Sequence, residues 1–314
     1  MRAVVTGGAG FIGSHLVRRL NKEGWDVLVL DNLSSGHREN VPHRTRFLWA
    51  DLTASDIEKI LPNEAFDVIF HLASHVGQES SFTRPEFDLK SNIFPTLSLI
   101  NWAMEHNVKQ IVFASSVNVY GTQEEMPLTE LNPIDLPSPY AVGKFSSEAL
   151  LKIYANFGLK STVLRLFNVY GPGQDMDNIL QGMVSIYMSY VVKNLPVCVR
   201  GSLDRFRDFV FVTDVVDAFL RSVSSIASGK VYNVCSGRKV IVRDLIDQII
   251  TANGYDPRSY PIELGPATRQ DQFGYYGDNS LIMRDLGWRP NISLKDGLSI
   301  MCEDFNRRLN KVVS

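Results

Sequence analysis

The chain has 314 residues, 45% hydrophobic and 21% charged, which is the composition of a globular protein and excludes a disordered or fibrous one. Its 32 Lys and Arg against 34 Asp and Glu give a formal net charge of −2, which disfavours a nucleic-acid partner or an anionic membrane surface. Because no run approaches the roughly 20 apolar residues of a membrane span and no signal peptide opens the chain, we expect a cytoplasmic protein. Its 3 cysteines, Cys198, Cys235 and Cys302, form no metal or redox motif, so we expect free thiols and no metal site.

Short apolar runs alternate along the chain with segments of helical length. The runs are continuously apolar, which is typical of strands buried on both faces of a parallel sheet. The predicted strands are 3–6, 27–30, 47–50, 68–72, 111–115 and 162–167. The helices predicted among them are 11–22, 93–106, 139–157 and 213–224. This order predicts an α/β fold with a doubly wound parallel sheet.

After residue 167 the alternation loosens, and turn-forming residues such as Gly171, Pro172 and Gly173 become frequent. Residues 207–217 and 231–234 again have the composition of strands, so we expect the two parts of the chain to exchange segments. The predicted dinucleotide-binding domain comprises residues 1–167 with about 207–234. A smaller, loop-rich C-terminal lobe for the substrate comprises residues 168–206 and 235–314.

A glycine-rich turn, TGGAGFIG at residues 6–13, follows the first predicted strand and opens a helix. Gly7 permits the tight turn, Gly10 lets the backbone approach a pyrophosphate, and Gly13 lets the helix pack closely on the strand. The phosphates would then lie at the positive N-terminus of the helix. This pattern predicts a Rossmann-type dinucleotide site.

Acidic residues at two strand ends refine the choice of cofactor. Asp31 ends the second strand, where its carboxylate is placed to bind both ribose hydroxyls of NAD and to repel the 2′-phosphate of NADP. We therefore predict NAD. Asp51 and Leu52, at the end of the third strand, are candidates to flank the adenine, although Asp51 also suits a helix cap.

A serine, a tyrosine and a lysine are predicted to meet at the reacting end of the cofactor. Tyr140 and Lys144 are four residues apart on a predicted helix and share one face, so the ammonium can favour the ionised phenol. Ser115 and Ser116 follow an apolar strand, at the sheet edge where doubly wound folds bind ligands. Ser116, Tyr140 and Lys144 are therefore the candidate catalytic residues: the phenol takes a proton from a substrate alcohol while NAD accepts hydride from the same carbon.

With these motifs the chain resembles the extended short-chain dehydrogenases/reductases, in particular their NAD-dependent nucleotide-sugar epimerase/dehydratase branch. The resemblance covers nearly the whole chain and combines many motifs. They are TGGAGFIG at 6–13, Asp31-Asn32, HLAS at 71–74, SSVNVYG at 115–121, YAVGK at 140–144, RLFNVYGPGQ at 165–174, RDFVFVTDV at 207–215 and LGWRP at 286–290.

The resemblance implies roles for further residues. It confers catalytic roles on Ser116, Tyr140 and Lys144. The cofactor contacts include Tyr140 and Lys144 together with Gly7, Gly10, Gly13, Asp31, Asp51 and Leu52. The resemblance implies further cofactor contacts at Phe11, Ile12, Asn32, Ser35, Gly36, Leu72, Ala73, Ser74, Ser91 and Phe167. It implies contacts to a nucleotide-sugar at Ser116, Asn118, Tyr140, Asn168, Gln181, Val197, Val199, Arg207, Asp271 and Tyr275. Arg207 also suits a phosphate on physical grounds, because charge-assisted hydrogen bonds hold a diphosphate best.

The residues after Ser116 separate the reactions of the family. Sugar 4,6-dehydratases carry Asp-Glu where this chain has Val117 and Asn118, and neither of these can transfer a proton. Decarboxylating relatives use a Glu at the position of Asn118, and deoxysugar epimerase-reductases need a Cys/His pair that this sequence lacks. The chain looks most like the UDP-galactose 4-epimerases, in which hydride leaves C4, a 4-keto sugar turns over, and hydride returns to its other face.

The sugar is less firmly indicated than the reaction. By the resemblance, the position that limits N-acetyl groups falls at Tyr275, or at Tyr276, and a bulky side chain there favours UDP-glucose and UDP-galactose. UDP-N-acetylglucosamine and UDP-glucuronate stay open.

Two positions depart from the family pattern. The cofactor-contacting Lys common in 4-epimerases falls at Val76. The Arg usually found three residues before Asp271 falls at Thr268, with Arg269 as a neighbouring substitute.

Other readings and the assembly complete the sequence predictions. A CDP-sugar 2-epimerase and a redox-inactive NAD-binding sensor or scaffold are the alternatives.

Helices 93–106 and 139–157 correspond to those that pair in family homodimers, so the resemblance implies a homodimer, although their apolar faces also suit the core.

Overall fold

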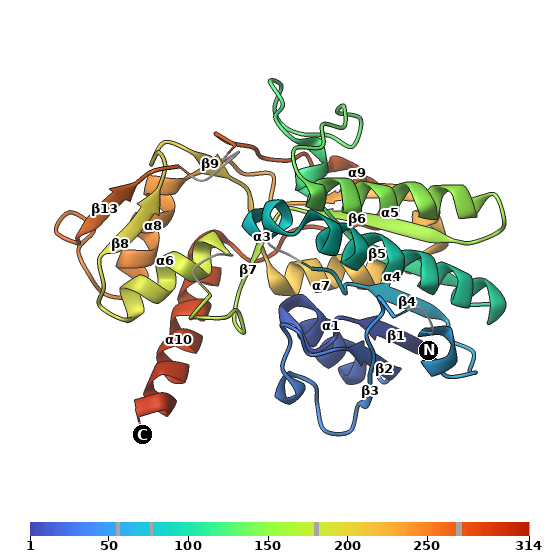
Figure 1. Cartoon of the computed structure of the whole chain (residues 1–314). Coiled ribbons are helices and arrows are strands. Elements are labelled where there is room, and N and C mark those ends of the chain that lie inside the picture. Colours follow the sequence, from blue (N-terminus) through green and yellow to red (C-terminus); the bar gives the residue numbers. More distant parts are fainter. Residues whose placement is uncertain (55–56, 76–77, 179–181, 268–271, 314) are drawn as a thin grey trace.

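The computed structural model describes residues 1–54, 57–75, 78–178, 182–267 and 272–313. Its centre is a seven-stranded parallel sheet in the order β11-β6-β5-β4-β1-β2-β3 (Figure 1). These strands are β1 (Arg2–Thr6), β2 (Asp26–Asp31), β3 (Arg46–Trp49), β4 (Val68–His71), β5 (Gln110–Ser116), β6 (Ser161–Leu166) and β11 (Lys230–Val234). The chain builds outward from β1 through β3 and then crosses to β4, on the other side of β1. Ligands of doubly wound sheets bind at such a switch of direction, at the carboxyl ends of the strands.

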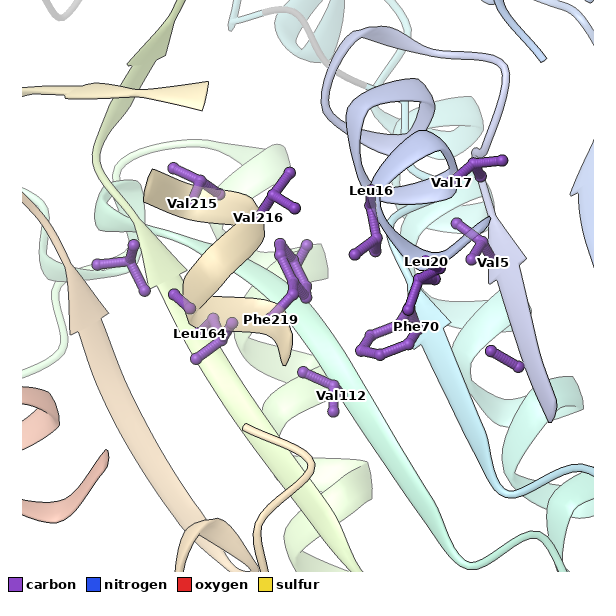
Figure 2. Packing of buried hydrophobic residues seen from close by; sticks show 14 of the residues in the cluster. Val5, Leu16, Val17, Leu20, Phe70, Val112, Leu164, Val215, Val216 and Phe219 are labelled. Atoms are coloured by element: carbon purple, nitrogen blue, oxygen red, sulfur yellow. The ribbon is translucent and has the colours of Figure 1, made fainter. Parts of the chain in front are cut away.

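Helices cover both faces of the sheet. On one face, α1 (Phe11–Lys22) and α7 (Val212–Arg221) pack through Leu16, Leu20 and Phe219 onto sheet residues such as Phe70 and Val112 (Figure 2). On the other face, α4 (Pro85–Glu105) and α5 (Pro139–Ala155) bury apolar side chains against β4 and β5. Shorter helical elements are η1 (Arg38–Asn40), α2 (Ile57–Ile60), α3 (Gln78–Thr83), η2 (Val117–Tyr120), η3 (Ser225–Ala227) and α9 (Ser280–Leu286).

A smaller lobe has its own apolar core beside the central sheet (Figure 1). Its helices are α6 (Met183–Val192), α8 (Val242–Ala252) and α10 (Leu294–Val313). Three two-stranded sheets join β8 (Val197–Arg200) to β13 (Ile262–Gly265), β9 (Phe206–Arg207) to β12 (Val240–Ile241), and β7 (Asn168–Tyr170) to β10 (Phe209–Phe211). The α/β fold with a doubly wound parallel sheet and a second lobe is as predicted, and the domain boundaries stay a prediction.

Two predicted elements differ from the structure. Helix α4 begins at Pro85, eight residues before the predicted start at residue 93. The apolar pattern does not reveal these first turns, because they carry mainly polar residues. Residues 207–217 are not one strand: β10 ends at Phe211 and α7 begins at Val212. The valine-rich sequence has the composition of a strand, but its valines face the core at helical spacing.

Among the described residues, no helix is long and apolar enough to cross a membrane.

Candidate active site

The glycine loop joins β1 to α1 in the geometry that a bound pyrophosphate needs. Gly7 has φ +68°, and a Cβ there would lie 2.8 Å from the main-chain nitrogen of Ala73. A Cβ on Gly13 would clash with the Gly7 carbonyl, so both positions require glycine. No acidic residue lies in the first turn of α1. The first turn of α1 therefore carries no negative charge that would oppose an anion at its N-terminus.

Asp31 holds the glycine loop against the end of β2. One carboxylate oxygen accepts a hydrogen bond from the Ala9 main-chain N–H at 2.9 Å, and the other accepts from the Leu33 N–H at 2.8 Å. Each oxygen has a second lone pair, so the carboxylate can still accept two hydroxyls of a ribose. The loop after β2, which contains Asn32 and Ser35, lies beside the glycine loop. Its Gly36 is so close that a Cβ there would lie 2.7 Å from the main chain of Ala9. These residues fit NAD.

Four predicted cofactor residues, Asp51, Leu52, Leu72 and Ala73, lie just after the ends of β3 and β4. Asp51 accepts hydrogen bonds from the main-chain N–H and the hydroxyl of Thr53, at 2.9 and 2.7 Å, which is the capping role noted above. The Leu52 side chain is buried in the core under α4. Leu72 and Ala73 lie against the glycine loop, since both donate main-chain hydrogen bonds to the Thr6 hydroxyl.

Ser116, Tyr140 and Lys144 come together at the carboxyl end of β5. Ser116 caps η2, and its hydroxyl accepts the Asn118 N–H at 3.2 Å. Tyr140 and Lys144 face the sheet from the first turns of α5 and are 8% and 3% exposed. The Lys144 ammonium lies 5.8 Å from the centre of the Tyr140 ring. The sequence therefore predicted the members of this cluster correctly as neighbours.

The ionisation of the pair depends on burial as well as on spacing. Burial raises the pKa of Tyr140 to about 12, and the neighbouring Ser116 and Ser74 hydroxyls lower it only in part. Burial lowers the pKa of Lys144 to about 7. Burial therefore opposes ionisation of the phenol in the protein alone, and the expectation that Lys144 together with bound NAD favours the ionised phenol stays a prediction.

Only one of the two serines after β5 is available to a substrate. Ser115 is 3% exposed, and its hydroxyl donates to the carboxylate of Glu148. That carboxylate also accepts from Arg165, at 2.7 Å from Nη2 and 3.1 Å from Nε. Ser115 therefore belongs to a buried ion pair beneath the site, and the alternation of the strand leaves Ser116 facing Tyr140.

On the second lobe's side, four predicted residues form one cluster. The Tyr275 hydroxyl donates to the Asn168 side-chain oxygen at 3.1 Å, and its ring centre lies 6.0 Å from that of Phe167. The Arg207 guanidinium lies 4.8 Å from the Tyr275 ring centre and donates to the carbonyls of Phe206 and Gln272, both at 2.8 Å. Three segments of the chain thus place a cation, an amide and aromatic rings together.

Other predicted substrate residues are placed differently. Val197 and Val199 are both 0% exposed and point into the lobe's core, so only their main chain can meet a ligand. Gln181 and Asp271, and the departures at Val76, Thr268 and Arg269, lie outside the described residues.

Sequence reasoning missed two polar residues of α4 that touch this site. Asn92 accepts a hydrogen bond from the Ser74 hydroxyl at 2.9 Å, and a Cβ on Gly143 of α5 would meet it at 2.8 Å. Asp88 is 0% exposed, bonds His75 at 2.9 Å, and its charge raises the pKa of both Tyr140 and Lys144. The signal that could have revealed them is a buried Asp and Asn on an otherwise apolar helix face.

The fold agrees with that of known proteins. The model of the NAD dependent epimerase/dehydratase family matches residues 3–235. The chain belongs to this family. A UDP-glucose 4-epimerase of Mycolicibacterium smegmatis is 36% identical over 98% of this chain and 99% of its own. This membership confirms the family that the motifs indicated.

Solved structures of the NAD-dependent epimerase/dehydratase family superpose on the whole chain. A UDP-glucose 4-epimerase with UDP-glucose from Thermotoga maritima has TM-score 0.94 and 34% identity, covering 98% of this chain and 100% of its own. A UDP-N-acetylglucosamine 4-epimerase from Methanobrevibacter ruminantium, in complex with UDP-N-acetylmuramic acid, has TM-score 0.91 and 30% identity, covering 98% of each chain. Epimerases named for different sugars thus share this fold, so the fold alone does not select the sugar.

Proposed function

We propose that this protein is an NAD-dependent 4-epimerase of a UDP-sugar, with UDP-glucose and UDP-galactose as the favoured pair. The observation that carries the proposal is the cluster of Ser116, Tyr140 and Lys144 with no acid or base beside it at Val117 and Asn118. Val117 is buried in an apolar cluster, and the Asn118 side chain carries no proton-transfer group. This set suits a reaction that moves one proton and one hydride at the same carbon and needs no second acid or base.

The chain's residues would divide the work as follows. The glycine loop and Asp31 hold the cofactor, and bound NAD would supply a hydride acceptor at the sugar C4 and a positive ring charge that favours the ionised phenol. Tyr140 takes the O4 proton as C4 is oxidised and returns it when C4 is reduced from the other face. Ser116 orients the same oxygen, and Lys144, fixed on the Ala114 carbonyl at 2.9 Å, supplies charge from beneath.

The second lobe would bind the nucleotide. In this proposal Arg207 pairs with the diphosphate, and Asn168 with Tyr275 borders the sugar. Tyr275 is 7% exposed and fixed by Asn168, Phe167 and Arg207, so it limits the space next to the sugar. This limit favours a hexose without an N-acetyl group over UDP-N-acetylglucosamine.

The assembly and location belong to the same proposal. Outside the core, α4, α5 and the turn after α5 expose apolar side chains: Phe94 is 54%, Ile153 53% and Phe157 67% exposed. The two helices lie side by side (Figure 1), so these residues offer a paired-helix face to a second copy of the chain. The 3 unpaired cysteines suit a reducing compartment, which favours the cytoplasm.

Product analysis tests the proposal. The purified protein is incubated in turn with UDP-glucose, UDP-N-acetylglucosamine and UDP-glucuronate without added NAD, and the anomeric protons are followed by NMR. We expect UDP-galactose from UDP-glucose, and no turnover by Tyr140→Phe at unchanged NAD content. A dehydrated or decarboxylated product would refute the reading of Val117 and Asn118. Turnover of CDP-sugars alone, or NAD binding without any turnover, would favour the 2-epimerase or the sensor instead.

A further inference from the structure

Four buried side chains connect the glycine loop to α5 through a continuous series of hydrogen bonds. Thr6 ends β1, His71 ends β4, Thr96 lies in α4 and Ser147 in α5, and none is more than 1% exposed. Thr6 Oγ1 lies 2.8 Å from His71 Nδ1, and His71 Nε2 lies 3.1 Å from Thr96 Oγ1. Thr96 then donates to Ser147 Oγ at 2.8 Å. We call this the Thr6–Ser147 series.

The direction of every proton in the series follows from its first member. The main-chain N–H of Ala73 donates to Thr6 Oγ1 at 3.1 Å, and the N–H of Leu72 is shared between Thr6 Oγ1 and the Thr6 main-chain carbonyl, both at 3.2 Å. Because Thr6 Oγ1 already accepts these N–H groups, we assign its own proton to the bond with His71 Nδ1, so that His71 carries its proton on Nε2 and donates it to Thr96. Burial, and then the charge of Lys144, lower the pKa of His71 to about 3, which keeps the ring neutral.

The series ends on α4. Ser147 Oγ donates to the main-chain carbonyl of Asn92 at 2.9 Å, and the Asn92 side chain bonds the Ser74 hydroxyl beside Tyr140. All protons thus run one way, from the loop after β4 through His71 to α4 and α5. A charged His71 would need an acceptor at both ring nitrogens, whereas Thr6 Oγ1 already accepts the Ala73 N–H and shares the Leu72 N–H.

The two ends of the series carry different parts of the proposed site. Thr6 precedes Gly7 in the cofactor loop, while Ser147 lies one helical turn beyond Lys144 in α5. The His71 ring centre also lies 5.4 Å from that of Phe113, and the Lys144 ammonium lies 5.0 Å from the same Phe113 ring. A shift of His71 would therefore move the cofactor loop relative to Tyr140 and Lys144.

We propose that His71 is a positioning residue, which sets the separation between the cofactor loop and the Tyr140–Lys144 pair through one bond to Thr6 and one to Thr96. The inference rests on the proposed function, because it gives His71 a part in that site. It predicts that the two bonds can be removed separately with different results.

Three substitutions separate the two bonds. In His71→Asn the amide oxygen can replace Nδ1 as the acceptor for Thr6, and in His71→Gln the amide nitrogen can replace Nε2 as the donor to Thr96. His71→Phe keeps a ring against Phe113 and removes both bonds. We expect His71→Gln to weaken NAD binding about tenfold, and His71→Asn to lower kcat about tenfold at nearly unchanged Kd for NAD. His71→Phe should show both losses.

A matched control removes a buried network of similar size far from the site. Gln110 is 6% exposed at the amino end of β5 and donates to Thr162 Oγ1 and to the Ser222 carbonyl, both at 2.8 Å. Gln110→Leu should lower the melting temperature as His71→Phe does, with no change in NAD affinity. Because NAD affinity is measured by calorimetry without any sugar, a wild type that binds NAD but turns over no sugar would refute the proposed function and still leave the comparison of NAD affinity among His71→Gln, His71→Asn and His71→Phe.

The proposal is overturned by any of three results. One is equal loss of NAD affinity in His71→Asn and His71→Gln. Another is unchanged NAD affinity and kcat in His71→Phe. The third is a loss of NAD affinity in Gln110→Leu that matches its loss of stability, since His71 would then act only through the stability of the fold.

Discussion

Lys144 is bonded to the Ala114 carbonyl at 2.9 Å, while its ammonium lies 5.8 Å from the centre of the Tyr140 ring. The lysine is therefore anchored to β5, and it acts on the phenol by its charge and not through a direct bond. Burial reverses the usual order of the two pKa values: that of Lys144 falls to about 7, and that of Tyr140 rises to about 12. Near neutral pH the lysine is the group of the pair whose charge changes.

The first prediction concerns stability against pH. Unfolded Lys titrates near 10.4, so between about pH 7 and that value the unfolded chain binds a proton that the folded chain does not. Raising the pH through this window therefore favours the folded wild type. Lys144→Met should have a larger free energy of unfolding than the wild type. The difference should be largest below pH 7 and should shrink toward pH 10. Urea denaturation at several pH values measures it, with Lys152→Met, at an exposed site of α5, as control. A difference independent of pH would contradict the lowered pKa.

The second prediction concerns the ion pair beneath the site. Glu148 and Arg165 are 6% and 5% exposed and are joined at 2.7 Å. Arg165→Met leaves a buried carboxylate without its partner and should cost about 3–5 kcal/mol of unfolding free energy. The double variant Glu148→Leu/Arg165→Met should recover much of this loss. If the single variant were nearly neutral in chemical denaturation, the pair would be exposed to solvent in solution.

Local patterns in the sequence were sufficient for most of the sheet and for the proximity of the three candidate catalytic residues. Continuous apolar runs identified β1, β2 and β6, and the glycine spacing placed the loop between β1 and α1. Ser116, Tyr140 and Lys144 were predictable because each lies at a strand end or a helix start that the fold brings to one edge.

Contacts between distant segments were not predictable from one sequence. The Thr6–Ser147 series joins residues up to 65 positions apart in a single bond, and no periodicity reports such a contact. The effect of burial on the pKa of Tyr140 could not be predicted either, because the spacing of Tyr140 and Lys144 reports a neighbouring charge but not the degree of burial. The predicted helix at 213–224 is present as α7 (Val212–Arg221), but the end of the strand before it was not predictable, because valine-rich runs suit strands and buried helices equally.

The third prediction concerns the choice of cofactor. Asp31→Asn removes the negative charge that would accept the ribose hydroxyls and repel a 2′-phosphate. We expect the Kd for NAD to rise about 10- to 100-fold and the preference over NADP to narrow, as measured by calorimetry on protein stripped of cofactor. Asp26→Asn, at the exposed start of the same strand, is the control. An unchanged ratio of the two affinities would place the ribose elsewhere.

The fourth prediction concerns the proposed homodimer. Ile153→Glu with Phe157→Glu puts two charges on the apolar face formed by α4 and α5, and should convert the dimer to a monomer in light scattering. Leu264→Glu changes a side chain of similar exposure, 66%, on β13 and should leave the dimer intact. A monomeric wild type would refute the dimer. Dissociation by Leu264→Glu alone would move the interface to the second lobe.

Transfer of an isotope tests the central claim, that C4 is inverted by oxidation and reduction on the bound cofactor. UDP-glucose carrying deuterium at C4 is incubated with the purified protein in ordinary water, and the product is analysed by NMR and mass spectrometry. The account predicts UDP-galactose that keeps its deuterium at C4, since hydride returns to the carbon it left. Loss of the deuterium to water, or its transfer to another carbon, would contradict the account.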